Sequence, residues 1–228
     1  MNVDKQTQRD SQELRQNFEM LEQERREIAY ALHNEMGQQL TAIRTAAQLM
    51  IRQSEGRQTH PVAQTIVELT DGMFTQMHHM LQRLRPSTLD KLGLIAALED
   101  LVLLNHEQLQ LTTSLELDGD VETTEQSMKA DLELAIYRIV QEALTNAVRH
   151  GQAKMAKVLL RKDGNRLKLE VSNNGQALDA ALDSLLQRKR SSVGLFGIKQ
   201  RVQAWGGEIH FENAGQQVVL TCLFPLDF

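Results

Sequence analysis

The sequence lacks features that mark several large classes of protein. It has a single cysteine, Cys222, among 228 residues, which excludes a disulfide framework and fits a reducing compartment. No apolar run approaches the roughly 20 residues that a membrane-spanning helix needs, and the polar first ten residues lack the apolar region of a signal peptide. Aromatic residues make up only 4%, so the core must be built from the plentiful Leu, Ile, Ala and Met, which favour helices.

An excess of positive charge is also missing. The formal net charge is -5 and the pI is about 5.8, which argues against nucleic-acid binding, because that needs a basic surface. With 41% hydrophobic residues the chain can still form a real core, and its length suits one large domain or two small ones. We expect a cytoplasmic location, either as a soluble protein or as the cytoplasmic portion of an inner-membrane protein.

Two long amphipathic stripes occupy the first part of the chain. Apolar residues recur every three or four positions from Leu14 to Met50, interrupted at Arg25, and again from Val62 to Leu84. The polar segment SEGRQTHP separates the stripes, and Pro86 should end the second helix. These stripes predict an antiparallel helical hairpin. One hairpin has too little interior to bury both stripes, so we expect a homodimer with a four-helix bundle.

The pattern changes after Pro86 to a mixture of helices and strands. We expect helices over residues 94–104, about 125–150 and about 196–205, and strands over 111–118, on both sides of a turn at 163–165, over 208–214 and over 217–224. Gly206 and Gly207 should stop the last helix. This order predicts an α+β sandwich, in which helices cover one face of a mixed sheet. The boundary between bundle and sandwich should lie between Pro86 and Gln110.

His33 lies in the stretch ALHNEMGQQLTAI, one step away from the apolar face of the first helix. An ordinary surface histidine and a reactive histidine both remain open from this position alone. An exposed, neutral imidazole can accept a phosphoryl group through a ring nitrogen, and a neighbouring side chain can orient the other nitrogen. Gln38 could position a water for the reverse event, hydrolysis of a phosphoryl group on a partner protein.

Three downstream segments suit phosphate binding. Glu142, Asn146 and Arg149 fall at helical spacing on one face, and an Asn amide oxygen ligates hard cations such as Mg²⁺. The segment VSNNG ends a strand, and a glycine pair in VGLFG precedes a helix, where the backbone can approach phosphates. Each segment alone also fits a solvated helix face or a plain turn. Their order behind a histidine helix makes the combination more specific.

The motifs resemble those of bacterial two-component sensor histidine kinases of the nitrate-sensor and hexose-phosphate-sensor (NarX and UhpB) type. The dimerisation and phosphoacceptor helix of that family is similar to ERREIAYALHNEMGQQLTAIRTAAQL. Its N box is similar to YRIVQEALTNAVRHGQA, its first glycine box to VSNNG, and its second to VGLFGIKQRVQAWGGEI. The resemblance implies an input signalling helix at 1–25, a dimerisation and histidine phosphotransfer domain at 26–90, and a catalytic ATP-binding domain of the GHKL (Bergerat) type at 91–228.

The resemblance also implies a mechanism. ATP and Mg²⁺ would bind in the sandwich, with the metal held partly by Asn146. The γ-phosphoryl group would pass to His33 and then to an aspartate on a response regulator receiver domain. The residues implied in catalysis are His33, Asn34, Gln38 and Glu142. The residues implied in the nucleotide pocket are Asn146, Arg149, His150, Asn173, Gly175, Gly194, Leu195 and Gly197.

Several positions depart from the family pattern. Asn34 and Asn173 stand where the family has Asp, so neither side chain carries the usual negative charge. Ala177 and Ser192 replace glycines of the two glycine boxes, and Gln216-Gln217 stands near the place of a Gly-Thr pair. An amide orients an imidazole but cannot take its proton, so we expect slow autophosphorylation. The changed glycine boxes predict weakened or lost ATP binding.

These departures motivate an alternative, a degenerate, ATP-poor homologue that acts as a dimeric regulator-binding scaffold or phosphatase. A third possibility is another ATPase with the same sandwich, such as a gyrase-like or chaperone-like domain, but the histidine helix argues against it. His78 and His79 point about 100° apart on a helix and do not form a metal clamp.

Overall fold

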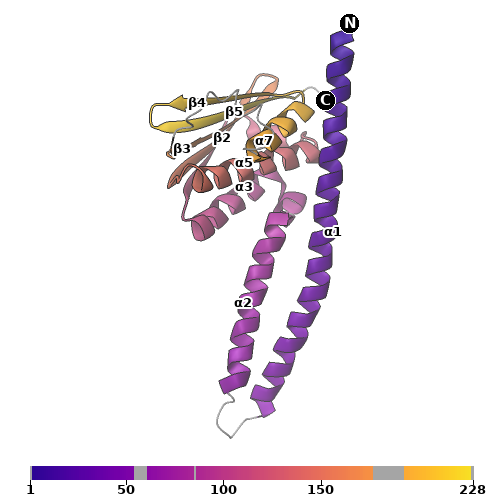
Figure 1. Cartoon of the computed structure of the whole chain (residues 1–228), viewed down its shortest axis with the longest axis vertical. Coiled ribbons are helices and arrows are strands. Elements are labelled where there is room, and N and C mark those ends of the chain that lie inside the picture. The colour runs from indigo at the N-terminus through magenta and orange to yellow at the C-terminus, as the bar shows by residue number, and fades with distance from the viewer. Residues whose placement is uncertain (1, 54–60, 85, 177–192, 227–228) are drawn as a thin grey trace. The chain divides into compact units, whose positions relative to one another are not determined.

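The computed structural model describes residues 2–53, 61–84, 86–176 and 193–226 (Figure 1). These residues form two compact units. One unit is the helical segment Met20–Ser87, and the other combines Thr88–Phe228 with Met1–Glu19. Within the described residues no helix is both long enough and apolar enough to span a membrane.

The helical unit is a pair of long helices, α1 (Asn2–Gln53) and α2 (Pro61–Leu84). Its buried seam consists mostly of small and unbranched side chains, namely Ala29, Leu40 and Ala47 of α1 and Ala63, Thr70 and Met77 of α2. The α2 members come seven residues apart, which is coiled-coil spacing. An ion pair joins the helices where Arg44 Nε lies 3.2 Å from Asp71 Oδ1. The structure confirms the predicted second helix, while the polar connection lies outside the described residues.

The helix after Pro86 is longer than predicted and contains a break. Helix α3 runs from Ser87 to Leu109, and Gly93 within it has φ 88° and ψ -175°, a conformation that only glycine adopts readily. The Ile95 amide donates to Glu125 Oε1 at 2.8 Å, so Glu125 caps the helical segment that restarts after the break. The prediction of a single short helix over 94–104 was therefore wrong in its extent.

A five-stranded sheet has the order β1-β2-β3-β5-β4. Its strands are β1 (Thr112–Asp118), β2 (Met155–Asp163), β3 (Arg166–Asn173), β4 (Glu208–Ala214) and β5 (Gln217–Pro225). The β1–β2 pair is parallel, and the other three pairs are antiparallel, so the predicted mixed sheet is confirmed. The β2–β3 turn is tight because Gly164 takes a positive φ of 57°.

Helices α5 (Ala130–Arg149) and α7 (Val193–Ala204) pack on one face of the sheet (Figure 1). Alternate residues of β2 and β3 are buried, as expected for a sheet with helices on one side only. The helix predicted from about 125 is divided, since α4 (Val121–Glu125) ends first and α5 starts after the extended Lys129. The structure confirms the predicted α+β architecture and the helix stop at Gly206, which has φ 64°.

Candidate nucleotide site and phosphoacceptor helix

The last turns of α5 carry the candidate phosphate-binding residues. Glu142 and Asn146 are partly buried, whereas Arg149 and His150 are exposed at the end of the helix. The Asn146 side-chain nitrogen is itself buried and has no hydrogen-bond partner among the described residues. A buried amide N–H without a partner is unfavourable by about 1–3 kcal/mol, so this position is suited to a polar ligand.

The start of α7 lies directly against these two α5 residues. A Cβ atom added at Gly194 would collide with the Glu142 carboxylate and lie 2.9 Å from Asn146 Nδ2. Only a residue without a side chain therefore fits at position 194. Leu195 is partly buried against the core cluster, and a Cβ at Gly197 would lie 3.0 Å from the Arg201 guanidinium. The structure thus brings the second glycine box onto the N-box residues Glu142 and Asn146.

The end of β3 joins the C-terminal end of α5. Asn173 Oδ1 accepts the Gly175 amide at 3.0 Å, and the Gln176 amide donates to the Gly151 carbonyl at 2.7 Å. A Cβ at Gly175 would lie 2.8 Å from the same carbonyl oxygen, so the two backbones touch. Gly151 was not among the predicted site residues. Its position directly after the predicted helix is the local signal for it, because glycine permits a close approach of two backbones.

Asn174 has a structural task in the same turn. Its Oδ1 accepts the backbone amides of Lys154 and Met155 at 3.0 and 2.9 Å, at the start of β2. The Asn-Asn-Gly sequence is therefore more than a surface turn, because it fastens the N-terminal end of β2 to the C-terminal end of β3. Ala177 and Ser192, two of the positions that depart from the family pattern, lie outside the described residues.

The candidate phosphoacceptor lies on α1 in the other unit. His33 and Gln38 are exposed, and Asn34 is partly buried, while Leu40 on the apolar side is 6% exposed. The exposure of His33 agrees with its predicted place at the edge of the apolar face. Gly37 leaves space beside this part of the helix, because an added Cβ would meet only the Met77 side chain, at 3.9 Å.

Two further titratable groups of the sandwich, Cys222 and Tyr137, are poorly suited to react at neutral pH. Burial raises the pKa of the Cys222 thiol to about 12, so this cysteine is not a nucleophile at neutral pH. Burial likewise raises the pKa of Tyr137 to about 12. Among the described residues no cluster of His, Cys, Asp and Glu could hold a metal ion by itself.

Comparison with known proteins decides the family. Residues 24–89 match the HisKA_3 histidine kinase model, and residues 131–227 match the HATPase_c model of histidine kinase-, DNA gyrase B- and HSP90-like ATPases. The chain belongs to the histidine kinase family. The two matches together do not support the hypothesis of a gyrase-like or chaperone-like ATPase, because such a protein would not carry the histidine kinase domain at residues 24–89. The resemblance to sensor histidine kinases is thereby confirmed.

Individual relatives agree with this assignment. The kinase homologue is 32% identical to the sensor histidine kinase MctS of Rhizobium johnstonii over 90% of this chain and 43% of that protein. It is 30% identical to the sensor histidine kinase LiaS of Bacillus subtilis over 90% of this chain and 56% of that protein. The chain thus spans about half the length of the curated relatives it matches, and these comparisons do not favour the degenerate-scaffold alternative.

A solved structure supports the fold. The histidine kinase domain of a blue-light activated histidine kinase from Erythrobacter litoralis EL346 superposes with a TM-score of 0.50 at 16% identity. The superposition covers 84% of the kinase homologue and 94% of that chain. At this identity the similarity concerns the fold alone.

Proposed function

We propose that the protein is an ATP-dependent protein-histidine kinase that phosphorylates His33 and passes the phosphoryl group to an aspartate of a response regulator. The observation that carries this proposal is that the Gly194 backbone lies against Glu142 and Asn146 in a domain that matches the ATPase model. The buried Asn146 side-chain nitrogen has no hydrogen-bond partner within the described part of the chain. The proposed division of labour is input helix 1–25, phosphotransfer domain 26–90 and catalytic domain 91–228.

The nucleotide would be held by the C-terminal end of α5 and the N-terminal end of α7, which meet at Gly194. The residues fit a magnesium–triphosphate ligand, since Asn146 offers a metal-binding amide oxygen and a buried N–H donor. Mg²⁺, when bound, would neutralise phosphate charge during the transfer. Arg149, which is exposed on the same helix, supplies a positive charge, and the backbone around Asn173 and Gly175 borders the base-binding end.

In the proposed reaction a neutral ring nitrogen of His33 attacks the γ-phosphorus of ATP. The bond between that phosphorus and the bridging oxygen breaks, an N–P bond forms, and ADP leaves. Glu142 would act at the transferring phosphoryl group, and Asn34 would orient the second ring nitrogen. Because an amide takes no proton, the imidazole proton must leave to solvent or to Glu35, and autophosphorylation should be slow. Rate enhancement in such transfers rests mainly on positioning and charge stabilisation.

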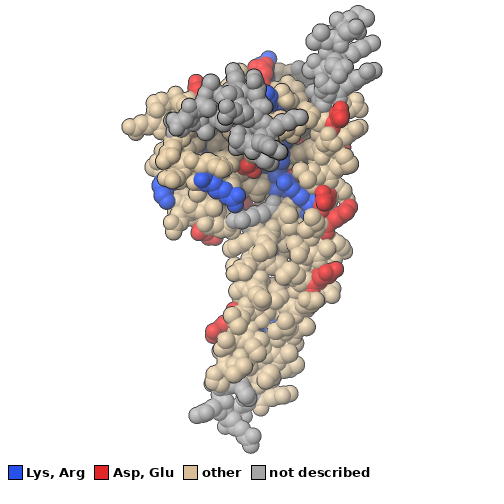
Figure 2. Space-filling model, viewed as in Figure 1, with Lys and Arg blue, Asp and Glu red and all other residues tan. Residues whose placement is uncertain are grey.

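Dimerisation would provide the phosphoacceptor bundle. A row of apolar side chains on the helical unit is 41–65% exposed in the single chain, namely Leu21, Ile28, Met36, Ile43, Met50, Val62, Leu69, Met73 and Met80. The face of this unit drawn in Figure 2 carries few charged side chains. We propose that a second copy of the chain covers this row. The receiver domain of the response regulator would then bind near His33 and Gln38.

A labelling experiment tests the proposed function. Incubation with ATP labelled at the γ-phosphate and Mg²⁺ should place label on the protein in a form that is stable to base and labile to acid. The label should be absent from His33→Gln and retained by His78→Gln, which changes an exposed histidine of α2. Asn146→Ala should also abolish the label while the circular dichroism spectrum stays that of the wild type. Equal labelling of wild type and His33→Gln would refute the assignment.

A further inference from the structure

The first helix contacts the sandwich through a short segment that the proposed function does not use. Leu14 and Phe18 of α1 pack against the buried core cluster of the sandwich. Arg15 between them is partly buried, and its guanidinium carbon lies 4.4 Å from the centroid of the Trp205 ring. We call Leu14, Arg15 and Phe18 the latch. All three belong to the same compact unit as the sandwich.

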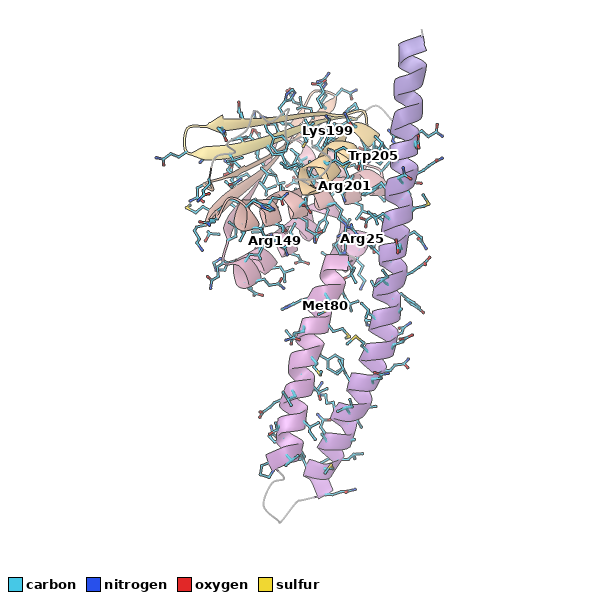
Figure 3. All side chains as sticks on the ribbon, viewed as in Figure 1. Arg25, Met80, Arg149, Lys199, Arg201 and Trp205 are labelled. Atoms are coloured by element: carbon cyan, nitrogen blue, oxygen red, sulfur yellow. The ribbon has the colours of Figure 1, made fainter. Side chains whose placement is uncertain are left out.

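The latch binds the C-terminal end of α7. Arg15 Nε donates a hydrogen bond to the backbone carbonyl of Ala204, the last residue of this helix. Cations are favoured at this end of a helix, where carbonyl groups lack helical partners. In a second cation–π pair the cation comes from α7 and the ring from α1, because the Arg201 guanidinium lies 5.6 Å from the centroid of the Phe18 ring. Figure 3 shows Arg201 and Trp205 at this end of α7.

The opposite end of α7 lies at the nucleotide site. Gly194, in the first turn, is the residue whose backbone rests on Glu142 and Asn146. The helix has 12 residues, which corresponds to a length of about 18 Å. A packed helix of this length moves as a rigid element, so a force at Ala204 also positions Gly194. The backbone at Gly194 lies against the two α5 side chains that the proposed function assigns to the nucleotide, and in this position it leaves no room beside them even for a methyl group.

We propose that the latch is a regulatory device that holds α7 in a closed position, and that release of the latch opens the nucleotide site. The inference rests on the proposed function, because it assumes that nucleotide binds beside Glu142 and Asn146. The apparent nucleotide affinity of the latched protein is the affinity of the open form multiplied by the fraction of molecules that are open. By linkage, bound nucleotide weakens the latch by the same factor. An upstream signal that displaces residues 14–18 would therefore raise nucleotide binding.

The test compares a latch variant with a matched control in the full chain. The variant is Arg15→Ala with Phe18→Ala, and the control is Gln16→Ala with Asn17→Ala, two exposed positions of the same helical turn. Affinity for the magnesium complex of a non-hydrolysable ATP analogue is measured by calorimetry. We expect the latch variant to bind at least about fivefold more tightly than wild type, within the usual range of allosteric coupling. The control should bind like wild type.

Trp205 supplies a readout that does not depend on nucleotide, because it is the only tryptophan in the chain. Its fluorescence without nucleotide should change in the latch variant and stay unchanged in the control. Arg15→Lys keeps the charge and the packing of Phe18 but loses the planar group that stacks on the ring. It should give an intermediate affinity, which guards against a folding defect in the double variant.

Three outcomes overturn the inference, and only one of them also overturns the proposed function. Equal or weaker nucleotide binding by a latch variant whose Trp205 fluorescence has changed shows that release does not open the site, and the proposed function stands. Absence of nucleotide binding by wild type and all variants at millimolar concentration removes the proposed function together with the inference. An unchanged Trp205 signal in a folded latch variant shows that the Arg15 contact does not form in solution.

Discussion

Glu133, in the first turn of α5, should make the sandwich less stable as the pH rises. Burial, and secondly the nearby Glu125 carboxylate, raises the pKa of Glu133 from 4.5 to about 7. The folded protein therefore holds a proton between these pH values that the unfolded chain has released. This contribution to stability is fully present below pH 4.5 and is lost as the pH rises through 7. The helix dipole, which favours a charged carboxylate here, is outweighed by burial.

The magnitude follows from the shift. At about 1.4 kcal/mol per pKa unit, the full shift corresponds to roughly 3 kcal/mol. Because Glu133 is only partly buried and solvent screens it, we expect about 1–2 kcal/mol. Glu133→Gln removes the charge, so at pH 8 the variant should be more stable than wild type by that amount. At pH 5 the difference should shrink, because wild-type Glu133 is then mostly protonated.

Urea unfolding at pH 5 and pH 8, followed by the fluorescence of Trp205, measures this effect in the sandwich. Glu122→Gln is the matched control, since it removes an exposed carboxylate from the neighbouring helix α4. The control should show the same pH dependence as wild type. If Glu133→Gln also follows the wild-type pH dependence, Glu133 is charged in the folded protein at neutral pH, and the reasoning from burial is refuted.

Three further changes test other parts of the structure. Gly93→Ala should lower the free energy of unfolding, measured by urea titration, by about 1–3 kcal/mol. The added Cβ would lie 2.7 Å from Glu125 Oε1, and φ is positive at this position. A loss below about 0.5 kcal/mol, the size of ordinary surface effects, would contradict this expectation. Gln38→Ala should slow dephosphorylation of the regulator while His33 is still labelled, and unchanged dephosphorylation would end its proposed role. Met73→Asp should give a monomer in analytical ultracentrifugation, since Met73 is 56% exposed in the single chain; a persistent dimer would exclude this face.

Local periodicity was sufficient to predict most helices and strands. The stripe from Val62 to Leu84 predicted α2 because its apolar residues recur at the spacing that places them on one face of a helix. The glycine pair at Gly206 likewise predicted the end of α7. The break at Gly93 was missed, because the apolar pattern around it is helical and only the contact with Glu125 shows why the chain turns there.

The candidate site was only partly predictable from the sequence, because contacts between distant segments leave no local pattern. Helical spacing placed Glu142 and Asn146 on one face, but no local signal could show that Gly194 would rest upon them. The hydrogen bond from Arg15 to Ala204 joins residues that are 189 positions apart. Sequence periodicity describes neighbours within a helix or strand, whereas such contacts arise only when the tertiary fold brings distant segments together.

The backbone contact between Gly151 and Gly175 also limits how the domain can be re-engineered. A Cβ at Gly151 would lie 2.7 Å from the Ala147 carbonyl oxygen, and one at Gly175 would lie 2.8 Å from the Gly151 carbonyl oxygen. Neither position has room for a methyl group, so a saturation library should retain glycine at both. A chimera that exchanges the end of α5 with a relative should therefore carry the segment around Gly175 from the same parent.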